Sequence, residues 1–175
     1  SLKANTFILN KDFIVAEGTD NIEYYLSTDT EISPQERYFQ MKNSKVEAVK
    51  RYLFFTTRSQ KWLFFKVYNP QEVPFDFLLE MGNFGLNQAD YYIFYNDSIL
   101  ESGTVATRSG LKTSEYYDRN IVIPYTAQAQ REYTFLIRIQ TNAPIFDMPL
   151  VIWNKHNKFL ISQGIEFGRG MFYGV

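Results

Sequence analysis

The sequence predicts an all-β fold in which two antiparallel sheets pack face to face, as a sandwich or a barrel. Aromatic residues make up 18% of the 175 residues, with 16 Phe and 13 Tyr, and these side chains suit the pleated, half-buried surface of a sheet. Runs in which apolar and polar residues alternate recur along the chain, and no helical period separates them. We therefore expect antiparallel sheets and not a parallel α/β sheet.

Each expected strand is a short alternating run that ends near a Pro, Asn, Lys or Gly. In KWLFFKVYN, the side chains of Leu63, Phe65 and Val67 share one face. In EYTFLIRIQT, the odd-numbered residues face the core and the even-numbered residues form a mixed face. The expected strands are Lys61–Asn69, Phe75–Met81, Asp90–Tyr95, Arg119–Tyr125, Glu132–Thr141, Met148–Trp153 and Phe159–Ile161.

A helix start is recognisable in ISPQERYFQM. Ser33 can cap the helix, Pro34 takes the first helical position, and Glu36 completes a capping box. We expect a short helix from Pro34 to Gln40 that closes one end of the sandwich. No linker composition or internal repeat divides the chain, so residues 1–175 are expected to form a single domain with 1–20 as its N-terminal segment.

Charge and composition argue against several classes of function. The 18 Lys and Arg nearly balance 19 Asp and Glu, which leaves a formal charge of −1, and nucleic acid is therefore not an expected partner. The chain has no cysteine and a single histidine, His156, which is interpreted as an exposed turn residue, so neither a metal site nor a cofactor is expected. Since no Ser-His-Asp set, nucleophile elbow or phosphate loop occurs, we do not expect an enzyme.

A glycoside hydrolase of the sandwich class is a weaker possibility that needs two carboxylates at a defined separation. The acidic residues that could serve are Asp76, Glu80, Asp90 and Glu101, and solvated strand positions explain them more simply. Asn96-Asp97-Ser98 matches a glycosylation pattern, but an exposed turn after a strand is its simpler interpretation. No run of about 18 apolar residues is present that could span a bilayer.

The candidate ligand-binding residues are aromatic side chains beyond those that a core needs, together with two arginines. The aromatic residues that could stack on a sugar or another ring are Tyr91, Tyr92, Tyr116, Tyr117, Trp62 and Trp153. Arg119 and Arg138 could hold a carboxylate through paired hydrogen bonds. In the alternative interpretation, Trp62 packs in the core or at a sheet edge, and Arg138 is solvated or pairs with a neighbouring acid. Arg119 would then pair with Asp118, Asp90 or a backbone carbonyl and pin the loop to the sheet. Arg119 stands at a loop–strand junction, where binding residues tend to lie.

An ordered set of segments resembles one known family. The segments are YYLSTDTEISPQE, WLFFKVYN, FLLEMGN, LNQADYYIFY, YYDRNIVIPY, YTFLIRIQTNAPIFDMPLVIW and EFGRGMFYGV. They are similar to the second type of extracellular sensor domain of bacterial seven-transmembrane receptors with diverse intracellular signalling modules. The residues that match positions of this family are Trp62, Asn69, Leu79, Leu86, Tyr95, Gly103, Arg119, Arg138, Gly170, Tyr173 and Gly174. The resemblance covers the chain from about Asn21 onward.

The resemblance implies a jelly-roll sandwich similar to carbohydrate-binding modules. It also implies a function as the periplasmic input domain of a membrane-bound receptor, with a carbohydrate or another small molecule as ligand. Membrane helices of the same receptor would then follow Val175, with Glu166–Val175 leading toward the membrane. A homodimer is compatible with such a receptor. The alternative is a secreted carbohydrate-binding module or lectin-like domain.

The family's arginine matches Arg119, and we therefore expect the ligand near this residue. Tyr116, Tyr117 and Trp62 are the expected aromatic walls, and Arg138 is a further expected contact. An aromatic-lined pocket with a fixed cation would suit a sugar acid or a similar anion.

Overall fold

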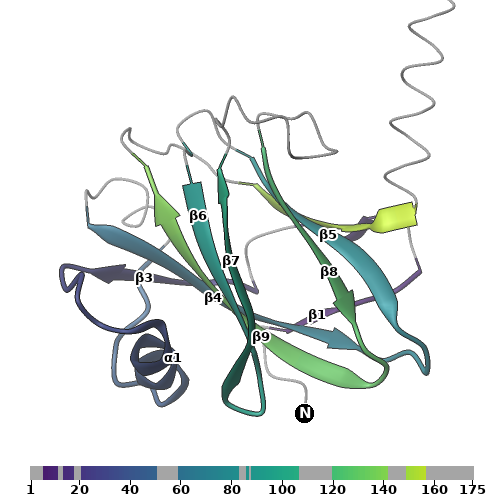
Figure 1. Ribbon diagram of the computed structural model, residues 1–175, viewed down its shortest axis with the longest axis horizontal. Coiled ribbons are helices and arrows are strands. Elements are labelled where there is room, and N and C mark those ends of the chain that lie inside the picture. The colour runs from purple at the N-terminus through teal and green to yellow at the C-terminus, as the bar shows by residue number, and fades with distance from the viewer. Residues whose placement is uncertain are drawn as a thin grey trace, which may run out of the picture.

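The computed structural model describes residues 6–11, 14–17, 21–50, 59–82, 86, 88–106, 120–141 and 149–156. Within these ranges the chain forms two β-sheets and a short helix (Figure 1). The elements in chain order are β1 (Thr6–Ile8), β2 (Ile14–Glu17), β3 (Glu23–Ser27), α1 (Pro34–Lys42), β4 (Gln60–Asn69), β5 (Phe75–Met81), β6 (Gln88–Tyr95), β7 (Ser98–Ala106), β8 (Ile121–Ala127), β9 (Arg131–Gln140) and β10 (Leu150–Asn154). The all-β prediction is confirmed, whereas the jelly-roll connectivity stays a prediction.

The two sheets form the layers of a sandwich. The larger sheet has the strand order β1-β4-β9-β6-β7, and β3 also pairs with β4. The smaller sheet has the order β2-β10-β5-β8. Each layer therefore combines strands that are far apart in the sequence, and each has one face toward the other layer and one face away from it.

One pairing departs from the purely antiparallel sheets that the sequence predicts. Two short strands share one edge of β4: β3 pairs antiparallel with Gln60–Phe64, and β1 pairs parallel with Lys66–Tyr68. Between β1 and β3 the chain passes through β2 in the smaller sheet, and it returns to β4 in the opposite direction. The alternation of side chains within a strand does not encode such a crossover, because it is the same for both strand directions.

The inner faces of the sheets form one apolar core, and the faces predicted for β4 and β9 are confirmed. The odd-numbered side chains 63–67 of β4 and 133–139 of β9 are buried in it. The rings of Phe65 and Phe135 stack with centroids 5.4 Å apart. Phe77 on β5 in the smaller sheet lies 6.1 Å from Phe135, so aromatic contacts connect the two layers.

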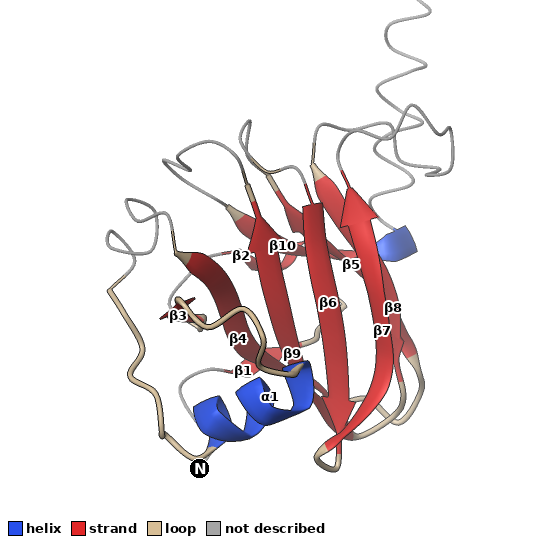
Figure 2. Cartoon of the chain, turned by 60° about the vertical axis from the view of Figure 1, so that its left-hand side comes forward, coloured by secondary structure: helices blue, strands red, loops and turns tan. Residues whose placement is uncertain are grey.

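Helix α1 lies across the outer face of the larger sheet (Figure 2). The sequence predicts instead that it closes an end of the sandwich, and its contacts with the apolar side chains of that outer face correct this placement. Its predicted start is confirmed, because the Ser33 hydroxyl accepts a hydrogen bond from the amide of Glu36 at 3.2 Å. The helix ends at Lys42 instead of Gln40. Its buried face joins a second apolar cluster made of Tyr25, Tyr38, Met41, Trp62, Phe64, Phe94 and Leu136. The even-numbered face of β4 is therefore also buried where α1 covers it.

Asn69, the last residue of β4, forms hydrogen bonds to both the β4–β5 and the β8–β9 connections. Its Nδ2 lies 2.9 Å from the carbonyl oxygen of Val73, 3.1 Å from that of Ala127 and 3.2 Å from that of Gln128. Its Oδ1 accepts a hydrogen bond from the amide of Gln71 at 3.1 Å. The residue is fully buried, and buried backbone groups need such partners. Asn69 therefore stabilises the β4–β5 and β8–β9 connections together.

Most of the predicted strands are confirmed, with ends that shift by one or two residues. β5 has the predicted bounds, whereas β8 begins at Ile121 and continues to Ala127. β7 is not predicted, because most of its side chains are exposed and its sequence does not alternate. The turn predicted at Asn96-Asp97-Ser98 precedes β7, and its first two residues have positive φ angles of 49° and 64°. Phe159–Ile161 and Glu166–Val175 lie outside the described residues.

Candidate functional site

One row of side chains crosses the outer face of the larger sheet. Trp62 on β4 is the register partner of Arg138 on β9. Arg138 is in turn the partner of Asp90 on β6, and Asp90 is the partner of Thr104 on β7. Directly opposed residues of neighbouring strands point to the same face. The register of four strands therefore brings these side chains together.

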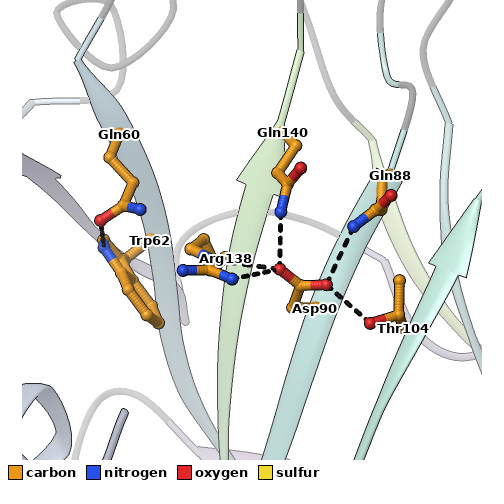
Figure 3. Close-up of polar contacts among 7 residues, drawn as sticks. All are labelled: Gln60, Trp62, Gln88, Asp90, Thr104, Arg138 and Gln140. Atoms are coloured by element: carbon orange, nitrogen blue, oxygen red, sulfur yellow. Dashed lines mark hydrogen bonds and ion pairs between the residues drawn. The ribbon is translucent and has the colours of Figure 1, made fainter. Parts of the chain in front are cut away.

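Three glutamines lie beside this row on the same face. Gln88 and Gln140 are register partners, and Gln60 precedes Trp62 at the next position of that face on β4. Figure 3 shows the amide groups of Gln88 and Gln140 turned toward Asp90, and that of Gln60 turned toward Trp62. We use the name polar cluster for Gln60, Trp62, Gln88, Asp90, Thr104, Arg138 and Gln140.

Asp90 is the centre of the polar cluster. Its Oδ2 accepts hydrogen bonds from Arg138 Nε at 3.0 Å, Arg138 Nη2 at 2.7 Å and Gln140 Nε2 at 2.7 Å. Its Oδ1 accepts from Gln88 Nε2 at 3.1 Å and Thr104 Oγ1 at 2.8 Å. Burial by itself raises the pKa of Asp90, but these hydrogen bonds outweigh burial and hold the pKa below its ordinary value. The carboxylate is therefore ionised at neutral pH and fixed in position.

Trp62 packs against Arg138 and orients Gln60. The guanidinium carbon of Arg138 lies 5.7 Å from the centroid of the Trp62 ring, and that of Arg37 on α1 lies 5.9 Å from it. The indole Nε1 donates a hydrogen bond to Gln60 Oε1 at 3.0 Å. Trp62 is 1% exposed, so its ring contacts protein groups and not solvent. Its cation–π contacts link the polar cluster to the helix.

Within the part of the chain that the structure describes, some hydrogen-bonding groups of the polar cluster have no partner. The side chain of Arg138 is 27% exposed, and its bonds to Asp90 use Nε and Nη2 but not Nη1. Gln88 and Gln140 use their Nε2 groups, which leaves their carbonyl oxygens as acceptors. Gln60 uses its carbonyl oxygen, which leaves its Nε2 as a donor. Because a hydroxyl group both donates and accepts, this combination can bind a ligand that carries several hydroxyls.

Tyr92 adds a half-buried aromatic ring beside the polar cluster. Its ring centroid lies 6.4 Å from that of Trp62, and it packs against the apolar cluster under α1. Burial raises the pKa of the Tyr92 phenol, the charge of Arg138 opposes this shift, and the charge of Asp90 adds to it. Tyr92 therefore lies between the helix-covered part of the outer face and the polar cluster.

Of the residues that the sequence singles out for ligand binding, the structure brings Trp62, Tyr92 and Arg138 together. The alternative in which Arg138 pairs with a neighbouring acid describes its contact with Asp90. Arg119, Tyr116 and Tyr117 lie outside the described residues. The predicted site near Arg119 therefore stays a prediction.

Sequence reasoning did not select the glutamines or Thr104. It considered Asp90 as a candidate catalytic carboxylate and as a possible ion-pair partner of Arg119, and not as the partner of Arg138. Their even positions on β4, β6, β7 and β9 are a signal, because polar residues on a strand face that is elsewhere apolar stand out. The strand register that assembles them is not readable from local sequence.

The other acidic residues considered for hydrolysis lie apart from the polar cluster. Asp76 accepts a hydrogen bond from the Thr126 hydroxyl at 2.6 Å, and Glu80 accepts one from Asn120 at 2.6 Å; both acids are on β5 in the smaller sheet. Glu101 accepts a hydrogen bond from the hydroxyl of Tyr91 at 3.1 Å. Each of these carboxylates therefore has a protein partner of its own.

Within the ranges that the structure describes, no group of three or more His, Cys, Asp and Glu side chains is arranged to hold a metal ion. His156 is exposed. Among the same residues, no helix has the length and apolar character needed to cross a membrane.

Comparison with known proteins identifies one family. The model of the family described as 7TMR-DISM extracellular 2 matches residues 19–154. The matched segment begins before β3 and ends with β10, so it contains α1 and every residue of the polar cluster. No curated protein matches the chain.

Proposed function

Because the chain belongs to the 7TMR-DISM extracellular 2 family, whose members are extracellular sensor domains of membrane receptors, we propose that it is the periplasmic ligand-sensing domain of a bacterial receptor. The ligand is a carbohydrate, bound at the polar cluster on the outer face of the larger sheet. The observation that carries this proposal is the set of partly exposed amides and one guanidinium around a buried, fully bonded carboxylate. Membrane helices of the same receptor follow Val175 in this proposal.

A neutral ligand fits the polar cluster better than an acid does. The positive charge of Arg138 is already balanced by Asp90, whose Oδ2 lies 2.7 Å from Nη2. A ligand carboxylate at Nη1 would also meet the negative charge of Asp90, and like charges in one site disfavour binding. Neutral hydroxyl groups meet no such penalty. The proposal therefore favours neutral sugars over the sugar acid that the sequence alone suggests.

β7, the strand that precedes Tyr116, Tyr117 and Arg119 in the sequence, ends beside the polar cluster. β7 ends at Ala106, and the register partner of Ala106 is Gln88. In the proposal, the two tyrosines and Arg119 complete the site from this side and supply exposed aromatic rings, which sugars need for stacking. Trp62 contributes by holding Arg138 and Gln60 in position.

Ligand binding would act on the receptor through a difference in affinity between two states. A ligand shifts an equilibrium only by as much as its affinities for the two states differ. The contacts of the Trp62 ring with Arg138 and with Arg37 on α1 offer one physical connection between the polar cluster and the rest of the domain. A ligand that moves Arg138 would also change the surroundings of the helix.

A thermal-shift screen with neutral sugars, sugar acids, organic acids and amino acids tests the ligand class, because a ligand that prefers the folded state raises the melting temperature. We expect a neutral sugar to raise the melting temperature.

Gln140→Ala should weaken binding of that sugar about tenfold, since it removes one or two hydrogen bonds. The matched control is Gln128→Ala, an exposed glutamine at the other end of β9. Stabilisation by sugar acids alone would contradict a neutral ligand.

Arg119→Ala tests the second part of the site. We expect it to abolish sugar binding while the melting temperature without ligand stays nearly unchanged. A ligand-binding Arg119 must be accessible, and an accessible arginine contributes at most about 1 kcal/mol to stability. A large loss of stability would identify Arg119 as a residue that pins a loop.

A reporter fused after Val175 in the full-length protein tests the receptor topology. A catalytic domain at that position would instead favour a secreted carbohydrate-binding module.

A further inference from the structure

Stacking of a sugar at the polar cluster needs an accessible aromatic ring, and Trp62 does not provide one because it is 1% exposed. On the outer face of the larger sheet, the described strands carry four buried aromatic residues, which are Tyr25, Trp62, Phe64 and Phe94. Two further aromatic residues of these strands and this face are half-buried, Tyr92 on β6 and Tyr68 on β4. Tyr68 is six positions from Trp62 along β4, which separates it from the polar cluster by about 20 Å. Tyr92 is the one that lies beside the polar cluster.

The strand register places Tyr92 next to Asp90 and Arg138. Tyr92 and Asp90 are two positions apart on β6, so their side chains share the outer face. Arg138 is the register partner of Asp90 on β9, which makes it a diagonal neighbour of Tyr92. β9 separates β6 from β4, yet the ring centroids of Tyr92 and Trp62 are only 6.4 Å apart. Both rings therefore extend toward β9, the strand that carries Arg138.

Packing holds the Tyr92 ring in place. The ring packs against the apolar cluster under α1, which includes its buried register partner Leu136. An aromatic side chain that is already ordered loses little conformational freedom when a ligand binds. Burial raises the pKa of the Tyr92 phenol, so the hydroxyl is protonated at neutral pH and can both donate and accept a hydrogen bond. Tyr92 thus combines a fixed aromatic ring with a polar end.

A pyranose ring matches this combination of a flat ring and neighbouring polar groups. Its C–H bonds lie on the two faces of the sugar, and its equatorial hydroxyl groups lie around the edge. A face can stack on Tyr92 while the edge hydroxyls bond to the cluster's remaining groups, which include Arg138 Nη1 and the carbonyl oxygens of Gln88 and Gln140. In a β-glucopyranoside all ring hydroxyls are equatorial, so both faces consist of C–H bonds. An open-chain polyol has hydroxyl groups but no such face.

We propose that Tyr92 is the residue on which the ligand of the polar cluster stacks, and that this ligand is a neutral pyranose with equatorial hydroxyl groups. The inference rests on the proposed function, because it takes the polar cluster as the carbohydrate site. It adds the stacking residue and the configuration of the sugar. Tyr92 selects the flat face, and Arg138, Gln88 and Gln140 select the hydroxyls at the edge. The two contributions can therefore be removed separately.

Isothermal titration calorimetry of the 175-residue chain with methyl β-glucopyranoside and with glucitol tests the need for a flat face. Glucitol is the open-chain polyol that corresponds to glucose. We expect the glucoside to bind about fivefold to tenfold more tightly than glucitol, because only the glucoside can stack on an aromatic ring. Equal affinities would overturn the inference, since hydrogen bonds alone would then account for binding.

Substitutions of Tyr92 test the residue. Tyr92→Leu keeps an apolar side chain against the cluster under α1 but removes the ring, and it should weaken glucoside binding about fivefold to tenfold. Tyr92→Phe keeps the ring and should bind within about threefold of the unmodified chain. The matched control is Tyr68→Leu, which removes the other half-buried tyrosine of this face and should leave the affinity unchanged. If Tyr92→Leu binds the glucoside as tightly as the unmodified chain does, the inference is overturned.

A second measurement does not depend on the folding of Tyr92→Leu. The ring signals of Tyr92 and Tyr68 in the NMR spectrum of the unmodified chain are assigned by their loss in Tyr92→Phe and Tyr68→Phe. Saturating glucoside should shift the signals of Tyr92 and leave those of Tyr68 in place. Unshifted Tyr92 signals would equally overturn the inference.

Gln140→Ala separates this inference from the proposed function. If Gln140→Ala weakens glucoside binding and Tyr92→Leu does not, the polar cluster stays the sugar site and only the stacking role of Tyr92 is excluded. If the unmodified chain does not bind the glucoside, the inference is overturned. The thermal-shift screen then decides separately whether another neutral sugar supports the proposed function.

Discussion

Arg138 donates two hydrogen bonds to a single oxygen of Asp90, from Nε at 3.0 Å and from Nη2 at 2.7 Å. The other oxygen of Asp90 remains available to Gln88 and Thr104. The carboxylate therefore connects β6 with both of its neighbours, β7 and β9. Because Asp90 is 5% exposed, this ion pair is shielded from solvent more than an ordinary surface pair.

Asp90→Ala should destabilise the protein by about 2–4 kcal/mol, because it leaves Arg138 without its counter-charge and leaves two amide groups and a hydroxyl without their acceptor. Unfolding in urea, followed by circular dichroism, measures this difference. The control is Asp76→Ala, since Asp76 is an exposed carboxylate with a hydrogen bond to Thr126. An equal effect of the two substitutions would contradict a special role of the polar cluster in stability.

The contribution of Asp90 should disappear in acid. The pKa of Asp90 in the folded protein lies below its ordinary value of 3.8, so the folded state binds this proton less readily than the unfolded state does. The stabilisation is therefore complete above the ordinary value and is lost as the pH falls through the lower, folded pKa. The difference in unfolding free energy between the unmodified chain and Asp90→Asn should shrink over this range of pH. If the difference in unfolding free energy instead grows in acid, the pKa of Asp90 is raised in the folded protein and not lowered.

Asn69→Asp should cost about 2–4 kcal/mol, although the two side chains have nearly the same size. The substitution replaces the donor that faces the carbonyl oxygens of Val73, Ala127 and Gln128 with a carboxylate oxygen. A buried negative charge that faces three carbonyl oxygens is costly. Chemical denaturation at neutral pH measures the loss. Asn96→Asp is the matched control, because Asn96 is exposed and Asp also tolerates its positive φ. Equal stability of both variants would exclude the role of Asn69 in stabilising the β4–β5 and β8–β9 connections.

Tyr38→Phe should destabilise the attachment of α1 by about 1 kcal/mol. It removes the hydrogen bond from the Tyr38 hydroxyl to Asp97 Oδ1, at 2.7 Å, and keeps the ring stacked on Phe94 at 3.9 Å. Hydrogen exchange should accelerate in α1 more than in β4 or β9, because the helix is held to the β6–β7 turn through Asp97. Uniform acceleration in all elements would show that helix and sheet open as one unit. Tyr68→Phe, on a half-buried tyrosine of β4, is the control.

Short sequence patterns determined which segments form the helix and the strands, and which side chains of β4 and β9 face the core. Ser33 and Pro34 start the helix because a cap needs only residues within one turn. The core-facing residues of β4 and β9 follow from a period of two, which the strand backbone imposes wherever the strand lies. The ordered motifs from Tyr24 to the Trp153 region also identify the family, and the family model matches the chain over 19–154.

Tertiary structure alone decided which strands are neighbours and in what register. Trp62, Arg138, Asp90 and Thr104 are up to 76 positions apart, from residue 62 to residue 138, and they meet because four strands pair in one particular alignment. The parallel pairing of β1 and the position of β7 at the end of the described strand order have the same origin. Register and strand order depend on the sum of contacts across both sheets, so no short stretch of sequence contains them. The alternation of side chains is a property of each strand by itself, and for that reason it could be read in advance.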